Sequence, residues 1–134
     1  MANDDCEFCD IEAFRSFGSP VYIENELCLF GNSDDGDGLR GSGIVVPKAH
    51  RPTVFDLTPA EVAATFELLN EAKRRLDARY APDGYTVGWA SGSAAGQKVF
   101  HAHLHVVPRY ADEPYAGRGF RWWLKQPENR PTGR

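Results

Sequence analysis

The chain has 134 residues, of which 42% are hydrophobic and 25% charged, and this composition predicts one globular domain spanning residues 1–134. The formal net charge of −4 is uneven: residues 1–97 hold 8 Lys/Arg against 16 Asp/Glu (−8), and residues 98–134 hold 7 against 3 (+4). This distribution disfavours a nucleic-acid-binding surface over the whole chain and permits a local anion site in the last third.

The N-terminus, MANDDCEFCD, is acidic and contains no apolar segment of the kind that signal peptides carry. No apolar run approaches the roughly 20 residues of a membrane helix, so no membrane contact is expected. The three cysteines, Cys6, Cys9 and Cys28, are an odd number, which indicates a reduced, cytoplasmic location and favours metal binding over disulfides. Cys28 lies in an apolar stretch and is expected to be a buried, inert thiol.

In chain order, the first expected elements are two paired strands, VYIE (21–24) and ELCLF (26–30), with Asn25 at the turn. The Gly/Asp-rich segment 32–43 is expected to form an exposed loop. It leads into a third strand, GIVVP (43–47), which ends at Pro47.

Residues 58–80 predict a long helix. Thr58 is a good N-cap, Pro59 suits the first helical position, and Glu61 completes a capping box. The expected apolar stripe has helical spacing and consists of Val62, Phe66, Leu69, Leu76 and Tyr80. The basic residues near its end suit the helix dipole and are expected to be solvated.

Two further strands are expected at YTVGWA (85–90) and VFHAHLHVV (99–107), joined by the Gly/Ala-rich loop SGSAAGQ (91–97). The order of three strands, one helix and two strands predicts an α+β fold: a mostly antiparallel five-stranded sheet with one main helix packed on it.

Three of the four histidines, His101, His103 and His105, alternate along the last strand and are expected to share one of its faces. The first and last then stand about 13 Å apart, whereas metal–nitrogen bonds are only about 2 Å long. One ion therefore binds at most two neighbours of the three, and at least one histidine is free for other chemistry.

Cys6 and Cys9 form a two-residue-spaced thiolate pair of the kind found in structural zinc sites. Together with His50 and one histidine of the row, they make up a closed Cys₂His₂ set with no open position for water. Such a site is structural rather than catalytic. The same residues packed together without a metal remain an alternative.

The loop 91–97 has the composition of a phosphate cradle, since glycines and small residues let backbone N–H groups approach an anion and Gln97 adds an amide. A neutral imidazole can attack phosphorus, and a protonated neighbour can balance the developing charge. Loop and histidine row together predict phosphoryl chemistry.

The segment GQKVFHAHLHVV (96–107) resembles the signature of the histidine triad (HIT) superfamily. The IVVPKAH segment and the capped helix occur in the family's order, so that the resemblance covers roughly residues 6–110 and leaves 111–134 as a C-terminal tail. The N-terminal C-x-x-C with His50 is similar to the zinc-bearing bacterial branch.

The resemblance implies a homodimeric nucleotide hydrolase or transferase that attacks the α-phosphate of nucleoside phosphoramidates, dinucleoside polyphosphates or related compounds. It implies that His103 is the nucleophile that forms a nucleotidyl-histidine intermediate, that His105 hydrogen-bonds the phosphate, and that Gln97 lies at the phosphate-binding loop. One structural zinc per chain is implied, with the ligands Cys6, Cys9, His50 and His101.

The resemblance also implies a nucleotide-binding site. Phe8, Ile11 and Phe30 correspond to the base pocket, and Asn32 lies near the acid that holds the ribose hydroxyls; Gln97 and His105 bind the phosphate.

Three departures from the family pattern bear on activity. Ala90 stands where relatives carry Asn or Gln, and the loss of one such donor costs about 2–4 kcal/mol of transition-state stabilisation. Lys98 replaces Ser or Thr after Gln97, and Asn32 replaces Asp.

Two other functions stay open. Ala90 favours a nucleotide-binding protein with weak or lost catalysis. A metallohydrolase would use His50, His101 and His103 around a catalytic ion and leave the cysteine pair idle. Removal of adenylate from DNA ends is disfavoured, because no second, basic domain is present.

Overall fold

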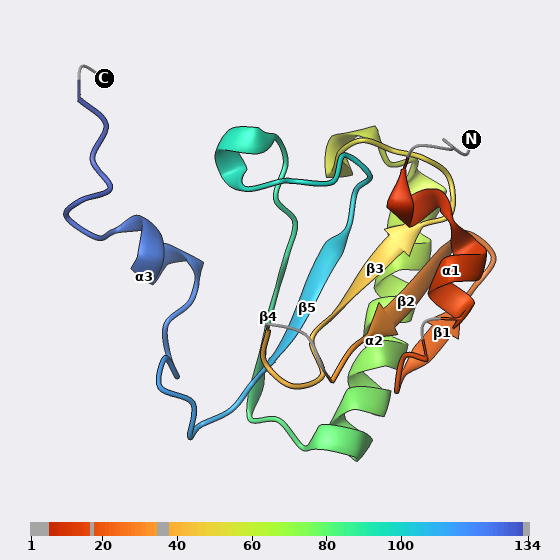
Figure 1. Cartoon of the computed structure of the whole chain (residues 1–134), viewed down its shortest axis with the longest axis horizontal. Coiled ribbons are helices and arrows are strands. Elements are labelled where there is room, and N and C mark those ends of the chain that lie inside the picture. Colours follow the sequence, from red (N-terminus) through yellow and green to blue (C-terminus); the bar gives the residue numbers. More distant parts are fainter. Residues whose placement is uncertain (1–5, 17, 35–37, 133–134) are drawn as a thin grey trace.

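A computed structural model describes residues 6–16, 18–34 and 38–132; the acidic residues 1–5 and the middle of the Gly/Asp-rich segment, 35–37, lie outside it. The expected fold is confirmed: an antiparallel sheet of five strands in the order β1-β2-β3-β5-β4 carries the long helix α2 on one face, and α1 covers the other face over β1–β3 (Figure 1). The strands are β1 (Tyr22–Glu24), β2 (Cys28–Asn32), β3 (Gly43–Pro47), β4 (Gly84–Gly88) and β5 (Leu104–Arg109). The helices are α1 (Ile11–Ser16), α2 (Pro59–Tyr80) and α3 (Phe120–Leu124).

The turn between β1 and β2 is built around Asn25, as expected. Its side-chain oxygen accepts hydrogen bonds from the backbone N–H groups of Leu27 (3.2 Å) and Cys28 (2.9 Å). This local bond reverses the chain and sets the register in which Ile23 faces Phe30.

The start of α2 is confirmed in detail. The Thr58 hydroxyl accepts from the Glu61 N–H, the Glu61 carboxylate accepts from the Thr58 N–H, and Pro59 is the first helical residue. At the other end, Ala81 adopts a left-handed conformation (φ 48°) that ends the helix.

The predicted apolar stripe of α2 is partly wrong. The buried face consists of Glu61, Thr65, Leu68, Ala72, Leu76 and Tyr80. Val62 and Phe66 are 38% and 46% exposed. The true stripe lies one residue earlier in the first half of the helix, where Glu61 and Thr65 occupy buried positions and make its pattern look polar.

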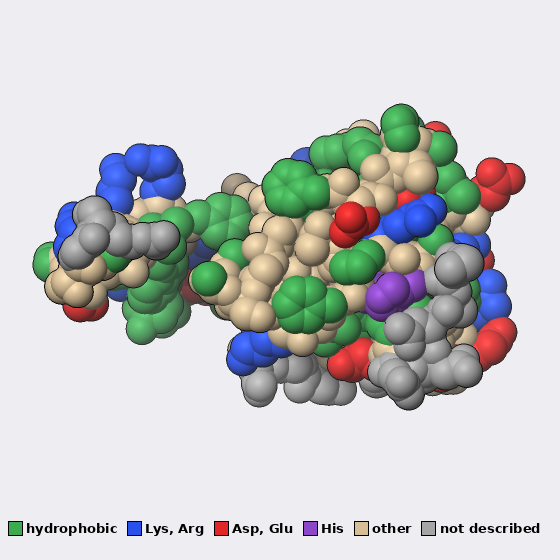
Figure 2. Space-filling view, turned by 90° about the horizontal axis from the view of Figure 1, so that it is seen from above, with side chains coloured by type: hydrophobic (Ala, Val, Ile, Leu, Met, Phe, Trp, Pro, Cys, Tyr) green, Lys and Arg blue, Asp and Glu red, His purple; other side chains and the backbone are tan. Residues whose placement is uncertain are grey.

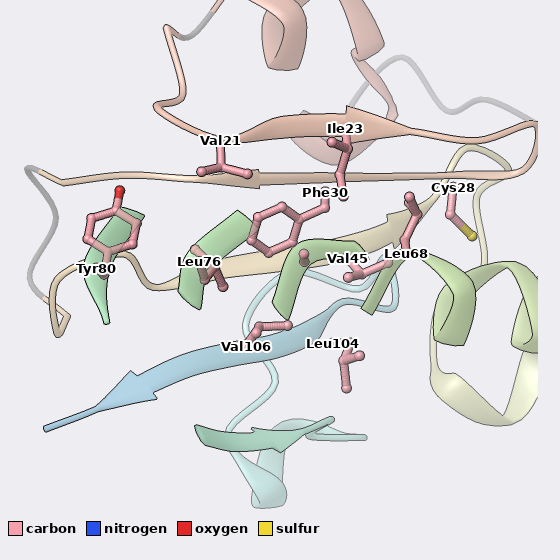
Figure 3. Packing of buried hydrophobic residues seen from close by; sticks show 11 residues of the cluster. Val21, Ile23, Cys28, Phe30, Val45, Leu68, Leu76, Tyr80, Leu104 and Val106 are labelled. Atoms are coloured by element: carbon pink, nitrogen blue, oxygen red, sulfur yellow. The ribbon is translucent and has the colours of Figure 1, made fainter. Parts of the chain in front are cut away.

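The main core lies between α2 and the sheet. Phe30, Val45 and Val106 extend from three adjacent strands toward Leu68 and Leu76 of α2 (Figure 3). Cys28 belongs to this core and is fully buried, with burial raising the pKa of its thiol, as expected for an inert residue. A smaller cluster of Phe14, Leu29 and Val46 packs on the opposite face under α1.

The histidine row is not one strand face. β5 begins only at Leu104, so His101 and His103 precede it and only His105 belongs to the strand. The alternation still predicts burial correctly at Ala102, Leu104 and Val106, which are 2%, 1% and 0% exposed. The backbone pairing with β3 covers only residues 104–106. Before them, the Ala102 N–H donates to the Arg51 carbonyl (2.6 Å), and the rings of His101 and His103 contact the N-terminal segment.

The C-terminal tail contains a helix, α3, which the sequence did not predict; it stands beside β4 and β5 at one side of the domain (Figure 1). Among the described residues, none of the helices combines the length and apolar character needed to cross a bilayer.

Candidate active site

Four side chains from three distant segments meet at one end of the sheet: Cys6, Cys9, His50 and His101. One ligand atom of each lies within 4.8 Å of all the others. A 3₁₀ turn at Glu7–Cys9, closed by a hydrogen bond from the Cys9 N–H to the Cys6 carbonyl (3.1 Å), orients both sulfurs. The group is the predicted Cys₂His₂ set.

The distances in this group suit a tetrahedral ion. The Nδ1 atom of His101 is 3.4 Å from each of the two sulfurs, and the Nδ1 atom of His50 is 3.3 Å from Cys9 Sγ. Zinc bonds of about 2.3 Å to sulfur and 2.0 Å to nitrogen separate tetrahedral ligands by about 3.5 Å. The four residues therefore fit a closed metal centre, which supplies structural cohesion rather than an open coordination position.

The protonation of His101 is set by its other nitrogen. Nε2 lies 2.7 Å from the Pro47 carbonyl, which can only accept, so Nε2 carries the proton and Nδ1 presents its lone pair to the sulfurs. Burial lowers the pKa of this ring, which is fully buried. Burial thus favours the neutral ring that a metal ligand requires, and the bond to Pro47 selects its tautomer.

His103 points away from that group and is held by a different carbonyl. Its Nδ1 lies 2.8 Å from the His101 carbonyl oxygen, so Nδ1 carries the proton in the neutral ring and Nε2 keeps a free lone pair. The Phe8 ring packs edge-on against His103, with 5.1 Å between centroids. This arrangement does not favour the metallohydrolase alternative, because the group that could hold an ion includes the cysteine pair and not His103.

His105 is the neighbour of His103 on the surface of the sheet. Their ring centroids are 4.8 Å apart. In register, His105 lies between Ile44 of β3 and Gly88 of β4. His105 is exposed at its surface, and desolvation by the surrounding atoms, followed by the adjacent His103, lowers its pKa. Two imidazoles of different environment thus lie side by side on the face opposite α2.

The loop 91–97 has the positive φ angles that glycine permits, at Gly92 (91°) and Gly96 (100°), around a 3₁₀ turn at Ser93–Ala95. Gln97 is only 4% exposed. Its side-chain oxygen accepts from the Gly92 N–H (2.8 Å), and its amide donates to the carbonyls of Pro52 (2.7 Å) and Val99 (3.1 Å). Gln97 therefore closes the loop from behind, and its amide is already engaged.

Two other loop residues differ in their surroundings. Ser91 Oγ is buried and has no hydrogen-bond partner within the described part of the chain. Lys98 is exposed. A buried hydroxyl without a partner is uncommon in proteins and indicates a group reserved for a ligand or water; the sequence reasoning did not single out Ser91.

A cavity of about 780 Å³, the α1 pocket, opens between α1 and the sheet. Phe8 and Phe14 form its α1 side, and Gly31 and Ile44 form its sheet side. Ile44 is the register partner of His105, so the pocket borders the two imidazoles. Ile11 packs in the small cluster that supports this layer.

The other predicted pocket residues are placed differently. Phe30 is fully buried on the α2 face, away from the α1 pocket, because side chains alternate along β2 and Leu29 and Gly31 face α1 instead. Asn32 lies at the edge of the pocket. Its oxygen accepts from the Val21 N–H (2.8 Å), and its amide donates to the Gly41 carbonyl and Tyr80 Oη (both 3.2 Å).

Sequence reasoning missed Phe14, Gly31 and Ile44. For the two strand residues, the available signal was the alternation of side chains between the two faces of a strand. Once every second residue of β2 or β3 is assigned to the core under α2, the residues between them must face the pocket. Phe14 had no comparable signal, because the six-residue helix α1 is too short for a periodic pattern.

The family model described as the HIT domain matches residues 21–112 of the chain. The protein named Protein hit of Bacillus subtilis is 30% identical over 107 residues, covering 80% of this chain and 72% of that protein. Adenylylsulfatase HINT3 of Arabidopsis thaliana is 31% identical over 106 residues; the match covers 79% of this chain but only 53% of the plant protein. The crystal structure of SMU.412c from Streptococcus mutans superposes with a TM-score of 0.71 at 30% identity, covering 87% of this chain and 73% of the other.

Proposed function

The chain belongs to the HIT domain family, and from this membership we propose that it is a nucleotide hydrolase or transferase that attacks the α-phosphate of nucleoside phosphoramidates, dinucleoside polyphosphates or similar nucleotidyl compounds. The observation that carries the proposal is the hydrogen bond from His103 Nδ1 to the His101 carbonyl. It directs the lone pair of Nε2 outward as a nucleophile. The name of the plant relative, an adenylylsulfatase, supports chemistry at a nucleotidyl phosphate.

The reaction has two steps. Nε2 of His103 attacks the α-phosphorus, the bond from phosphorus to the leaving nitrogen or oxygen breaks, and the leaving atom takes a proton as it departs. The product on the enzyme is a nucleotidyl-histidine. Water then attacks the same phosphorus, loses a proton, and releases Nε2 together with the nucleoside monophosphate.

Neighbouring groups stabilise the phosphate. His105, 4.8 Å from His103 between ring centroids, donates a hydrogen bond to a phosphate oxygen. The backbone of the loop 91–97 binds the phosphate through its N–H groups, and Gln97 contributes by holding that loop closed. The Ser91 hydroxyl is an additional donor.

The nucleoside part of the substrate binds in the α1 pocket, whose volume of about 780 Å³ is in the range of small-molecule sites. Phe8 contributes an apolar surface to the base, and Ile11 supports it from below. Asn32 supports the ribose end of the pocket without contacting the ribose through its amide, since that amide is bonded within the protein.

We further propose one structural zinc ion, held by Cys6, Cys9, His50 and His101. When bound, it supplies cohesion between the N-terminal segment and the sheet. Since no disulfide joins the cysteines of the described residues, we also propose a cytoplasmic location.

The homodimer is part of the same proposal. Its supporting observation is an exposed apolar surface beside the edge strand β4, in which Phe66 of α2 packs on Trp89 with 6.2 Å between ring centroids. Phe66 and its neighbour Val62 are exposed, and a second copy would cover them. A sedimentation experiment on Phe66→Glu tests this point, since the dimer should dissociate.

The alternative is a nucleotide-binding HIT protein with weak or lost catalysis, motivated by Ala90. Both functions require the α1 pocket, and they differ in the covalent step. The test is the intact mass of the protein after brief incubation with an adenosine phosphoramidate. We expect a gain equal to one adenylyl group in the wild type and none in His103→Ala.

The metal content of the two proteins serves as the control, and it should be equal because His103 is not in the ligand group. Absence of an adduct in the wild type, with the substrate also unconsumed while AMP still binds, would establish the alternative.

A further inference from the structure

The short segment between β3 and α2 contacts each part of the predicted site. His50 belongs to the metal group. The Pro52 carbonyl accepts from the Gln97 amide (2.7 Å), and the Arg51 carbonyl accepts from the Ala102 N–H (2.6 Å). The side chain of Arg51 has no role in the reaction described above.

That side chain is bonded to Glu61, a carboxylate at the start of α2. The Arg51 Nε donates to both oxygens of Glu61 (2.9 and 3.1 Å). The Glu61 side chain is only 5% exposed, and that of Arg51 is 33% exposed. Burial raises the pKa of Glu61, but hydrogen bonds from Arg51 and Thr58 outweigh burial, and the pKa lies below its ordinary value. Since a buried ion pair is often no more stabilising than apolar residues of the same size, we look for the value of this pair in the geometry that it fixes.

The peptide unit between His101 and Ala102 connects Arg51 with the predicted nucleophile. Its N–H donates to the Arg51 carbonyl (2.6 Å), and its C=O accepts from His103 Nδ1 (2.8 Å). In this trans peptide, the N–H and the C=O lie in one plane and point in opposite directions. Whatever fixes the direction of the N–H therefore also fixes the carbonyl that holds the proton of His103 on Nδ1.

The two hydrogen bonds of this peptide unit also act in series. A bond to the N–H polarises the peptide, and its carbonyl becomes a stronger acceptor for the next donor. The Arg51 carbonyl thus strengthens the bond to His103 Nδ1. Because Pro52 has no N–H, the peptide between Arg51 and Pro52 has no second hydrogen bond to fix it. The direction of the Arg51 carbonyl therefore depends on how Arg51 itself is held.

We propose that Glu61 is a positioning residue for the predicted nucleophile, His103, and that it acts through Arg51. The carboxylate holds the arginine side chain, and the carbonyl of the arginine holds the peptide unit that precedes His103. That peptide unit in turn keeps the proton on Nδ1, which leaves the lone pair on Nε2 for attack. This inference rests on the proposed function, because it assigns a group that orients the attacking imidazole; Glu61 takes no part in bond making.

The first measurement is the tautomer of His103 in Glu61→Gln, read from the nitrogen chemical shifts of its ring at a pH at which the ring is neutral. Glutamine keeps an oxygen for the Thr58 N–H, so the capping box is retained. Arg51 is partly exposed, so its unpaired charge is solvated. We expect the proton on Nδ1 in the wild type and a mixture of both tautomers in the variant. A variant that keeps the proton entirely on Nδ1 would overturn the proposal.

Glu113→Gln is the matched control, because Glu113 is a similarly buried carboxylate paired with an arginine. Its side chain is 7% exposed and lies 2.7 Å from Arg109, which is at the far end of β5, about 20 Å along the chain from His103. That pair holds the start of the C-terminal tail, which stands out from the body of the protein (Figure 2). The control should lose stability and keep the proton of His103 on Nδ1. A mixed tautomer in the control as well would indicate general loosening and refute a specific role for Glu61.

Kinetics supply a second readout. We expect Glu61→Gln to lower kcat for an adenosine phosphoramidate about tenfold, since a misplaced reacting group can cost up to about 100-fold. KM should stay unchanged, because neither Glu61 nor Arg51 lines the α1 pocket. Arg51→Met should lower kcat similarly, and adding Glu61→Gln to it should have no further effect on kcat, as for two residues that act in series. Additive losses, or a raised KM with unchanged kcat, would contradict the proposal.

The two readouts separate this proposal from the proposed function. The tautomer is measured without substrate, so a shift confined to Glu61→Gln would support the positioning of His103 even if the wild type formed no adduct, and only the proposed reaction would fail. An adduct in the wild type, together with an unchanged tautomer and kcat in Glu61→Gln, would refute the role of Glu61 and leave the reaction intact. Metal content should be equal in all these proteins, because neither Arg51 nor Glu61 belongs to the ligand group.

Discussion

Gln97 offers the sharpest test of how the phosphate loop is built, because its amide is engaged on all sides. Gln97→Met keeps the length of the side chain and removes its hydrogen bonds to Gly92, Pro52 and Val99. The site is 4% exposed, so water does not replace those partners. At about 1 kcal/mol per bond, with a further cost for the groups left unpaired, we expect a loss of about 2–4 kcal/mol in the free energy of unfolding.

Activity should fall with stability, since the N–H groups of the loop no longer converge on the phosphate. We expect kcat to fall about 10- to 100-fold. Urea unfolding and the rate of phosphoramidate hydrolysis measure the two effects on the same preparations. Gln126→Met makes the same chemical change in the C-terminal tail, where the amide donates only to the Trp122 carbonyl, and it should change neither quantity.

Gln97→Glu adds a test of sign. A carboxylate at this buried position would face the carbonyls of Pro52 and Val99, so its pKa would be raised. A raised pKa in the folded state means that the penalty is present at neutral pH and shrinks as the pH falls. We therefore expect the stability of this variant to approach that of the wild type in acid. A large fall in kcat with unchanged stability in Gln97→Met would refute the reasoning and indicate direct contact with the phosphate.

Three further predictions concern the metal group, the acid limit of stability and the loop. Cys9→Ser should lower zinc content, measured by atomic spectroscopy, and stability, whereas Cys28→Ala should keep the metal, because Cys28 lies in the core. Hydrogen bonds from Arg15 and then Tyr22 lower the pKa of Glu24 from 4.5 to about 2. At neutral pH, Glu24→Gln should therefore be less stable than the wild type. In unfolding experiments at different pH, this difference in stability should shrink to zero as the pH falls from 4.5 to about 2. Ala90→Asn should raise kcat by about 30- to 1,000-fold, equivalent to about 2–4 kcal/mol, by restoring a phosphate donor; an unchanged rate would show that Ala90 does not limit turnover.

The fold could be predicted because its signals are local. The capping box at Thr58, the turn at Asn25 and the segment GIVVP each specify their own conformation, and the structure places them as expected. The bounds of β2 and β5 were less accurate: β2 was expected at 26–30 and spans Cys28–Asn32, and β5 was expected at 99–107 and spans Leu104–Arg109. Strand ends depend on pairing with neighbours, which a local pattern does not contain.

The errors have a common physical origin. Phe30 was assigned to the base pocket, but its partner across the sheet is Val45 and both face α2. A shift of one residue along a strand exchanges the two faces, so a residue can be near the site in sequence and on the wrong side of the sheet. On α2, the predicted apolar stripe was likewise one residue off in the first half of the helix, because the buried positions there are held by the polar residues Glu61 and Thr65. Polar residues are buried there because Glu61 binds Arg51 (2.9 Å) and Thr65 donates to the Glu61 carbonyl (2.8 Å).

The departure of the histidine row from the strand connects the proposed metal centre with the proposed nucleophile. His101 uses its ring for the ligand group and its carbonyl for His103 Nδ1, so one residue fixes the position of the metal ligand and the tautomer of the predicted nucleophile. In a regular strand, that carbonyl would be directed to a neighbouring strand, and His103 would be free to carry its proton on either nitrogen. Removing the metal by chelation should therefore lower the rate of adenylylation of His103, although no ion contacts that ring. If His103 reacts at the same rate without the metal, the carbonyl of His101 is held by β5 and Arg51 alone, and the two sites are independent.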